Sequence, residues 1–248
     1  MSRAALQCEG LSRRFGGLMA VSDVWLSLAV GELHAVIGPN GAGKSTLVNL
    51  LSGKLRPSAG SVKLDGADVT SWPSWRLAQQ GIGRSFQRTN VLREMTVFEN
   101  VRLAAQAQGF GMARWLRRAA REPAPIAAAK AALDRVGLRV EGIAGTLSHG
   151  ELRLLEIAMA LATQPRVLLL DEPLAGMGPE EGEHVATLLK ELARDHAVLL
   201  IEHDMDFVFS VADTLTVMVE GRVLEQGTPA QIRASAAVRE AYLGHEVT

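Results

Sequence analysis

The sequence predicts an α/β fold: a mostly parallel sheet covered on both sides, with an N-terminal set of antiparallel strands and an inserted helical segment. Short apolar strands alternate with helical segments along much of the chain, which is typical of a parallel sheet. The runs Val167–Leu170 and Val198–Ile201 are apolar throughout, as strands buried on both faces are. Polar residues directly follow several strands, and ligands of such sheets bind beyond the carboxyl ends of the strands.

Antiparallel strands are expected in the N-terminal segment, at Leu6–Leu11 and Val24–Val30. Apolar residues occupy one face of the second strand with the period of two of a half-exposed strand, namely Val24, Leu26, Leu28 and Val30. Ser61–Leu64 is a further short strand, and an Asp-Gly pair after it indicates a hairpin turn. A short helix is expected between Pro73 and Gln80.

A glycine-rich loop follows the buried strand Leu33–Ile37 and leads into a helix that starts at Lys44. The loop fits the pattern G-x-x-x-x-G-K-[ST]. A glycine-rich turn that carries a lysine by chance is the alternative, but the strand before it and the helix after it favour a phosphate-binding loop. The loop residues are therefore candidate nucleotide ligands: Gly38, Pro39, Asn40, Gly41, Ala42, Gly43, Lys44, Ser45 and Thr46.

This loop predicts ATP and Mg²⁺ as ligands. Its glycines let successive backbone N–H groups point into one concavity, and the helix N-terminus adds a partial positive charge. Lys44 would reach the β- and γ-phosphates, and Ser45 would offer its hydroxyl to the metal ion.

Acidic and imidazole side chains follow two of the apolar strands. Asp171 is expected to hold Mg²⁺ through its water shell, and Glu172 is placed to polarise a water that attacks the γ-phosphate. A solvated turn is the alternative for this pair. His203 would hydrogen-bond the γ-phosphate, although a single histidine after a strand is more often structural. Gln87 would ligate the metal or the water, but nothing in the sequence alone separates it from the other glutamines.

A helical segment begins at about Thr89. A capping box, Thr96 to Glu99, opens a helix expected to reach Gln108, and Ile126–Val136 is a second helix. Four arginines surround Trp115 between them, at Arg114, Arg117, Arg118 and Arg121. A solvated helical face explains this run better than a site for anionic lipid heads or a partner.

A second capping box, Ser148 to Glu151, opens the next helix, which carries an apolar stripe expected to be buried: Leu152, Leu155, Met159 and Ala162. Its exposed N–H groups and Gly150 form a second candidate anion site. One chain does not easily bring this site to its own phosphate loop, whereas a second copy can supply it. The remaining pattern predicts a helix at Glu181–Arg194, strands at Leu215–Val219 and Arg222–Glu225, and a short helix capped by Thr228.

Composition excludes several classes of protein. The 248 residues carry a net charge of −1, which gives no reason to expect nucleic acid as a partner. Cys8 is the only cysteine, so neither an internal disulfide nor a cysteine-based metal site is expected. No apolar run approaches the roughly 18 residues of a membrane span, and no signal peptide is expected.

These motifs together resemble the ATP-binding subunit of ABC transporters over essentially the whole chain. The matching elements are the phosphate loop Gly38–Thr46, the glutamine loop at Gln87, the signature Leu147–Glu151, the pair Asp171 and Glu172, and the switch histidine His203. Three stretches are similar to the branched-chain amino acid import group, which includes urea and short-amide importers: Gly81–Glu99, Asp171–Glu181 and Glu202–Phe209.

The resemblance implies one domain with a P-loop NTPase core at about residues 1–88 and 165–227. A helical subdomain would span about residues 89–164, and a short helical tail residues 228–248. It also implies a head-to-tail dimer with an identical or paralogous subunit, in which Ser148 and Gly150 of one subunit face the phosphate loop of the other. Phe15 would stack on adenine, Asp171 would hold Mg²⁺ together with Ser45 and Gln87, and the catalytic residues would be Glu172, His203 and Lys44.

The same resemblance implies transmembrane permease subunits as partners, contacted near Gln87, and indirectly a periplasmic binding protein. The expected location is the cytoplasmic face of the bacterial inner membrane. Three positions depart from the family pattern. The signature has His149 where many members have glycine, Gly178 stands where many have aspartate, and Phe15 replaces the commoner tyrosine. The missing aspartate puts the usual contact across the dimer in doubt.

Four functions compete with an amino-acid importer. A urea or amide importer and a lipid or lipopolysaccharide exporter would use the same ATPase chemistry. An ABC-type ATPase that acts on ribosomes or DNA usually needs two such domains or a long coiled coil, and this chain shows neither. An unrelated P-loop kinase would not need the capped signature helix.

Overall fold

The computed structural model describes residues 4–85, 90–107 and 123–243, and its described strands form two sheets. The larger sheet has the order β10-β9-β3-β8-β7-β6. Its strands are β3 (Glu32–Ile37), β6 (Ile82–Arg84), β7 (Val167–Asp171), β8 (Ala197–Ile201), β9 (Thr214–Val219) and β10 (Arg222–Gly227). Only β10 pairs antiparallel, to β9, and the other pairs are parallel. The predicted α/β fold with a mostly parallel sheet is confirmed.

The smaller sheet is antiparallel and has the order β2-β1-β4-β5. Its strands are β1 (Ala4–Phe15), β2 (Leu18–Ala29), β4 (Ala59–Leu64) and β5 (Ala67–Asp68), and α2 (Ser74–Gln79) follows. Val24, Leu26 and Leu28 of β2 are buried while Trp25 between them is exposed. The alternation predicted for this strand is confirmed for these three residues, whereas Val30 is half-buried and lies just past the end of β2.

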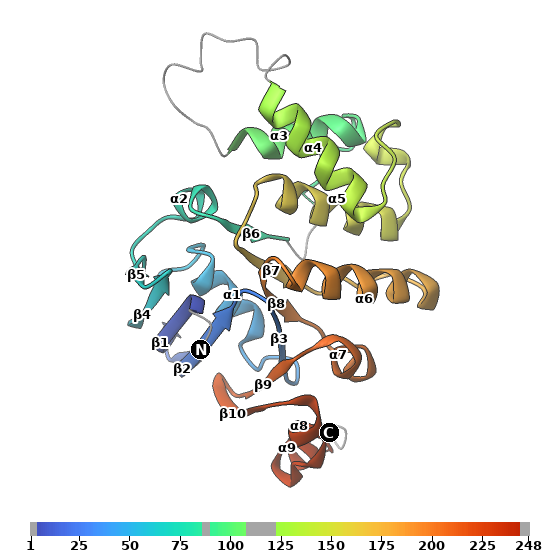
Figure 1. The fold of residues 1–248 in the computed structure, drawn as a ribbon. Helices are drawn as coiled ribbons and strands as arrows, with labels where there is room; N and C mark the ends of the chain where they lie inside the picture. Colours follow the sequence, from blue (N-terminus) through green and yellow to red (C-terminus); the bar gives the residue numbers. More distant parts are fainter. Residues whose placement is uncertain (1–3, 86–89, 108–122, 244–248) are drawn as a thin grey trace.

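The parallel sheet separates two hydrophobic cores, because its residues point alternately to its two faces. In β8, Val198 and Leu200 pack into one core, and Leu199 and Ile201 pack into the other. The helix α1 (Lys44–Leu51) and the antiparallel sheet cover the second face. The helices α6 (Pro179–Ala193) and α7 (Met205–Val211) cover the first, as Figure 1 shows.

Three helices pack together at one end of the molecule, drawn at the top of Figure 1: α3 (Val97–Gln106), α4 (Pro123–Val136) and α5 (His149–Ala162). A 3-10 turn, η4 (Ala144–Thr146), precedes α5. Both predicted capping boxes are present. The N–H of Glu99 donates to Thr96 Oγ1 and that of Glu151 donates to Ser148 Oγ, each at 3.1 Å.

The C-terminal helices α8 (Pro229–Ala234) and α9 (Ala236–Leu243) pack back onto the core through Ile232 and Val238. The guanidinium of Arg233 lies 4.4 Å from the ring centre of Phe209 in α7. Among the described helices, none has both the length and the apolar character that a membrane crossing requires.

The elements that the sequence did not predict include β6 and α7. The strand β6 has three residues, and its Gly83 lies against the ring of Pro165. The helix α7 has seven residues and relies on its cap, because Asp204 Oδ1 accepts the N–H of Phe207 at 3.0 Å. Both are too short to show a period in the sequence.

One finer expectation was wrong and one is untested. The helix α3 is described as far as Gln106, and Gln108, where the sequence placed its end, lies outside the described residues. Met159 of the apolar stripe on α5 is half-buried instead of buried, because it lines a groove. The arginine run at 114–121 lies outside the described residues.

Candidate active site

The phosphate loop connects the end of β3 to the start of α1, as the sequence predicts. Gly38, Gly41 and Gly43 have φ values of 152°, 81° and 97°, in the region that favours glycine. A Cβ on Gly38 would overlap the carbonyl of Met218 in β9, and one on Gly43 would overlap the carbonyl of Ala20 in β2. The loop therefore lies close to the backbones of two strands from different sheets, β9 and β2.

The N-terminus of α1 is open to a ligand, because Gly43 occupies its N-cap position and no side chain caps the helix. The first-turn N–H groups and the helix dipole favour an anion here. Lys44 Nζ donates to the carbonyl oxygens of Gly38 at 2.6 Å and Pro39 at 3.0 Å, so the ammonium lies over the loop. Burial lowers the pKa of Lys44, while the charges of Glu172 and Asp171 oppose that shift. The carboxylates at the end of β7 thus act electrostatically on the phosphate-loop lysine.

Asp171 is the last residue of β7 and is 2% exposed. Its N–H donates to Ser85 Oγ at 3.2 Å, and its Oδ2 lies 3.7 Å from Arg84 Nη2. Burial raises the pKa of Asp171, and the Arg84 charge opposes this. Its Oδ1 is buried with no hydrogen-bond partner among the described residues. An unpaired buried carboxylate oxygen is costly and fits a hard cation such as Mg²⁺.

Ser45 lies in the first turn of α1, where its hydroxyl is a second potential oxygen ligand. Within the described residues there is no group of three or more histidine, cysteine, aspartate or glutamate side chains that could hold a metal ion. A Mg²⁺ ion at this edge would therefore take most of its ligands from water and phosphate oxygens, as this ion commonly does.

Glu172 has a left-handed backbone with φ of 51°. Its N–H donates to the carbonyl of Ile201 in β8 at 2.9 Å, and its own carbonyl accepts the N–H of Ala175 at 3.2 Å. A non-glycine residue in this region is uncommon, and such residues cluster at functional sites. The negative charge of Glu172 contributes to raising the pKa of both Asp171 and Glu202. The strand end therefore concentrates carboxylates beside Lys44.

His203 follows β8, and its side chain is 70% exposed with Nδ1 at 3.6 Å from Glu202 Oε2. Glu202 itself is fully buried. Its Oε1 accepts the N–H of Leu174 at 2.9 Å, and its Oε2 accepts the N–H of His203 at 3.2 Å. A role for this carboxylate was not predicted from the sequence, although its place directly after an apolar strand was a signal.

Phe15 ends β1 in the hairpin with β2, opposite Leu18, and its side chain remains 42% exposed. The guanidinium of Arg13 lies 4.6 Å from the ring centre, within cation–π range. The same hairpin supplies Ala20, whose carbonyl contacts the phosphate loop at Gly43. The hairpin thus carries an exposed aromatic ring and also supports the loop.

Ser148 and Gly150 lie at the start of α5. This helix belongs to the helical part of the molecule, which consists of α3, α4 and α5. A Cβ on Gly150 would overlap the carboxylate of Glu181 in α6. Gly178 is the N-cap of α6 with φ of −80°, and a Cβ there would meet nothing within 4 Å. The backbone at position 178 would therefore accept an aspartate. Gln87, the remaining candidate, lies outside the described residues.

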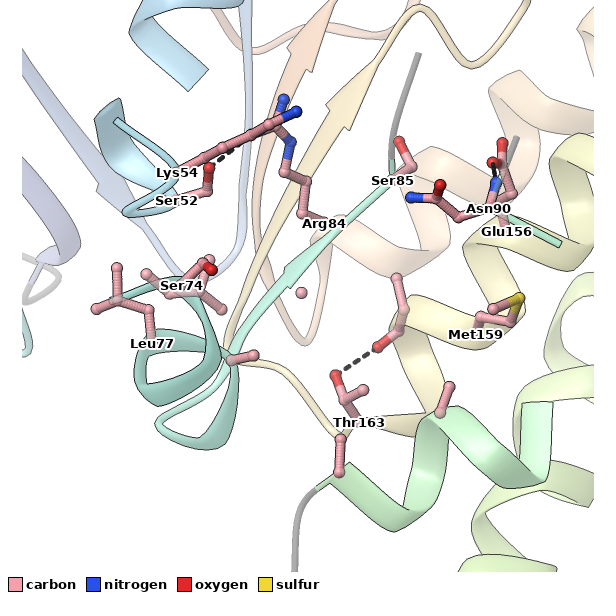
Figure 2. A pocket seen from close by; sticks show the side chains of 16 residues that line it. Ser52, Lys54, Ser74, Leu77, Arg84, Ser85, Asn90, Glu156, Met159 and Thr163 are labelled. Carbon is pink, nitrogen blue, oxygen red and sulfur yellow. Dashed lines mark hydrogen bonds between the residues drawn. The ribbon is translucent and has the colours of Figure 1, made fainter. Parts of the chain in front are cut away.

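A groove of about 290 Å³ separates the core from the helical part (Figure 2). Leu77 and Arg84 lie on one wall, and Asn90, Glu156 and Met159 lie on the other. Arg84 Nη1 donates to Ser52 Oγ at 2.6 Å across the core-side wall. Asn90 N–H donates to Glu156 Oε1 at 3.2 Å on the helical side. Arg84 thus lines this groove and also lies beside Asp171.

The chain matches known families along most of its length. Residues 21–175 match the family model described as ABC transporter. Residues 222–248 match the model described as branched-chain amino acid ATP-binding cassette transporter.

Named relatives and a solved structure are similar over nearly the whole chain. The high-affinity branched-chain amino acid transport ATP-binding protein BraF of Pseudomonas aeruginosa is 41% identical over 98% of this chain and 99% of its own. The corresponding LivG protein of Escherichia coli K12 has the same identity and coverage. The ADP conformation of an ATP-binding cassette of an ABC transporter aligns with a TM-score of 0.87 at 31% identity, over 97% of this chain and 99% of that chain.

The phosphate loop provides a direct test of the site. We expect Gly43→Ala to lose most nucleotide binding, because the new methyl group meets the Ala20 carbonyl at a residue with positive φ. Titration with a fluorescent ATP analogue, with thermal unfolding in parallel, measures the change. The matched control is Gly31→Ala, where φ is 91° but nothing lies within 4 Å of the new Cβ. Equal nucleotide affinity of the two variants would contradict the assigned loop.

Proposed function

The chain belongs to the ABC transporter family as an ATP-binding subunit, and on this premise we propose that it hydrolyses ATP to drive an importer of branched-chain or other amino acids. The observation that carries the chemistry is the convergence of Lys44, Asp171 and Glu172 at one edge of the sheet. The substrate class is supported by the match of residues 222–248 and by the branched-chain amino acid transport function for which BraF and LivG are named. A urea or amide importer and a lipid or lipopolysaccharide exporter remain the alternatives.

The phosphate loop binds the triphosphate through the backbone N–H groups at the start of α1 and through Lys44. Phe15 offers its partly exposed ring to the adenine, and the guanidinium of Arg13 lies 4.6 Å from the centre of the same ring. Ser45 and Asp171, together with Gln87, would hold Mg²⁺, which would supply positive charge to the phosphates. The buried Oδ1 of Asp171 supports this assignment.

Hydrolysis transfers the γ-phosphoryl group to water. The water oxygen bonds to the γ-phosphorus as the bond to the β–γ bridging oxygen breaks, and ADP leaves with the electron pair of that bond. Glu172 accepts the proton of the water, which its place at the carboxyl edge of the sheet supports. His203, with its exposed imidazole, contacts the γ-phosphate and reports its presence.

A second subunit completes the site. Ser148 and Gly150 lie at the start of α5 in the helical part, whereas the phosphate loop belongs to the core. Two subunits arranged head to tail bring the N-terminus of α5 in one to the γ-phosphate held by the other. Binding of ATP then closes the dimer, and hydrolysis reopens it.

The permease subunit docks in the groove between the core and the helical part. The floor and walls present apolar side chains such as Leu77, Ile82 and Met159, with Arg84 and Glu156 beside them (Figure 2). A short helix from the membrane partner fits such a groove by burying its apolar face. A permease bound in this groove would lie beside Arg84, the arginine next to Asp171.

The general base is tested by Glu172→Gln. We expect this variant to bind ATP with unchanged affinity and to lose turnover by roughly 100-fold or more, because the amide cannot accept the water proton. It should also accumulate as an ATP-dependent dimer. Phosphate release and size-exclusion chromatography with and without ATP measure both effects. Glu191→Gln, an exposed acid at the far end of α6, is the control. Wild-type turnover by Glu172→Gln would refute the assignment.

The groove is tested by Met159→Glu, which places a charge among its apolar residues. We expect the permease to be lost when the subunit is purified from membranes. The ATPase activity of the isolated subunit should change by less than about twofold, because the residues proposed to bind and hydrolyse ATP are unchanged. Leu224→Glu on β10, where the leucine is 42% exposed, is the control.

Mass spectrometry of what co-purifies with the wild-type chain identifies the transport direction. A periplasmic binding protein together with permease subunits supports import. Recovery of the permease with Met159→Glu at the wild-type level would contradict the docking site.

A further inference from the structure

A single buried carboxylate joins the two loops that carry the hydrolytic residues. Glu202 has no exposed surface. Its Oε1 accepts the N–H of Leu174, two residues after Glu172, at 2.9 Å, and its Oε2 accepts the N–H of His203 at 3.2 Å. Because each oxygen binds a different loop, the carboxylate fixes the spacing between the loop after β7 and the loop after β8.

Burying the Glu202 carboxylate is energetically unfavourable. Burial raises the pKa of Glu202, the two backbone N–H groups and His203 oppose that shift, and the charge of Glu172 adds to it. Removing a carboxylate from water is unfavourable unless its oxygens are hydrogen-bonded. The two bonds compensate for the burial only while both loops keep their present positions.

The bonds of Glu202 act on the strained part of the β7 loop. Glu172 has φ of 51°, and its N–H is already held by the carbonyl of Ile201 at 2.9 Å. Glu202 follows Ile201 directly and holds Leu174 by its N–H. The end of β8 therefore holds the turn at the two residues that flank Pro173, once through the Ile201 carbonyl and once through the Glu202 carboxylate. An uncommon backbone conformation persists when its surroundings determine it in this way.

We propose that Glu202 is a positioning residue for ATP hydrolysis: it holds Glu172 and His203 in fixed relation through Leu174 and the His203 backbone. The inference rests on the proposed function, because it gives Glu202 a part in the step that Glu172 and His203 carry out. Glu202 does not contact the phosphate loop through any hydrogen bond found among the described residues. Its effect should therefore fall on turnover and not on nucleotide binding.

The first test is Glu202→Ala in the full-length chain. We expect kcat for ATP to fall roughly 10- to 100-fold, the range set by the loss of hydrogen bonds to a charged group. KM for ATP should stay within about threefold, because Lys44 and Phe15 are unchanged. The matched control is Asp213→Ala at the opposite edge of the sheet. Asp213 Oδ2 also accepts a backbone N–H at 2.9 Å, from Leu33, and its loss should leave kcat unchanged.

Glu202→Gln separates positioning from simple packing and remains informative if the alanine variant folds poorly. The glutamine has nearly the same shape, but its NH₂ group cannot accept a hydrogen bond. It would therefore keep one of the two loop contacts and set a donor against the other N–H. We expect its kcat to fall as well, even with wild-type thermal stability. A purely structural role for Glu202 would leave kcat of this variant unchanged.

A double-mutant cycle with His203→Ala tests whether the residues act as a unit. We expect Glu202→Ala to lower kcat less in the His203→Ala background than in the wild type, because one of the two positioned groups is already absent. Fully additive losses in the cycle, or a Glu202→Gln protein with wild-type kcat, would overturn the inference. The proposed function is judged separately: it fails if the wild-type chain does not hydrolyse ATP or if Glu172→Gln retains turnover.

Discussion

The register of three parallel strands sets the position of every reactive group in the site. Val36 of β3 pairs with Ile201 of β8, and Asp171 of β7 pairs with the same Ile201. The three strands therefore end at one level, and the residues that follow them enter the same space: the phosphate loop, Glu172 and Glu202. The strands are buried on both faces, so a shift of one residue would exchange the two faces of a strand between two packed cores. The burial that stabilises the sheet therefore also fixes the positions of the residues at the ends of its strands.

Charge at this edge is concentrated and only partly neutralised. Burial raises the pKa of Asp171 and of Glu202 and lowers that of Lys44 and Arg84. Each acid is opposed by a nearby cation or by backbone N–H groups, yet Asp171 Oδ1 is left without a hydrogen-bond partner in the described part of the chain. In a medium less polar than water, such groups respond strongly to a new charge. A site built in this way favours a ligand that brings both cations and anions, as a metal-bound polyphosphate does.

The sequence predicted those parts of the site whose partners are close along the chain. The phosphate loop and both capping boxes depend on residues within one turn, so a fixed spacing reveals them. Arg84 was missed, and the place of Glu202 after an apolar strand did not reveal its role, because the partners of both residues are remote. Leu174 lies 28 residues from Glu202, and the loop after β6 meets Asp171 across 86 residues. The positive φ of Glu172 could not be predicted either, because no glycine at this position indicates it.

The start of α5 shows how a motif residue can meet two demands at once. The proposed dimer needs a small residue at Gly150 so that a phosphate can approach the helix N-terminus. Within one chain, the same position is already approached by the carboxylate of Glu181, whose Oε2 accepts the N–H of Gly178 at 3.0 Å. The Glu181 carboxylate therefore lies between the first turn of α5 and the first turn of α6, and α6 follows the turn that contains Glu172. A side chain at position 150 would therefore displace the Glu181 carboxylate as well as hinder the approach of a phosphate. The demand for a small residue at Gly150 thus arises inside each subunit, at the start of α6, and also in the proposed dimer.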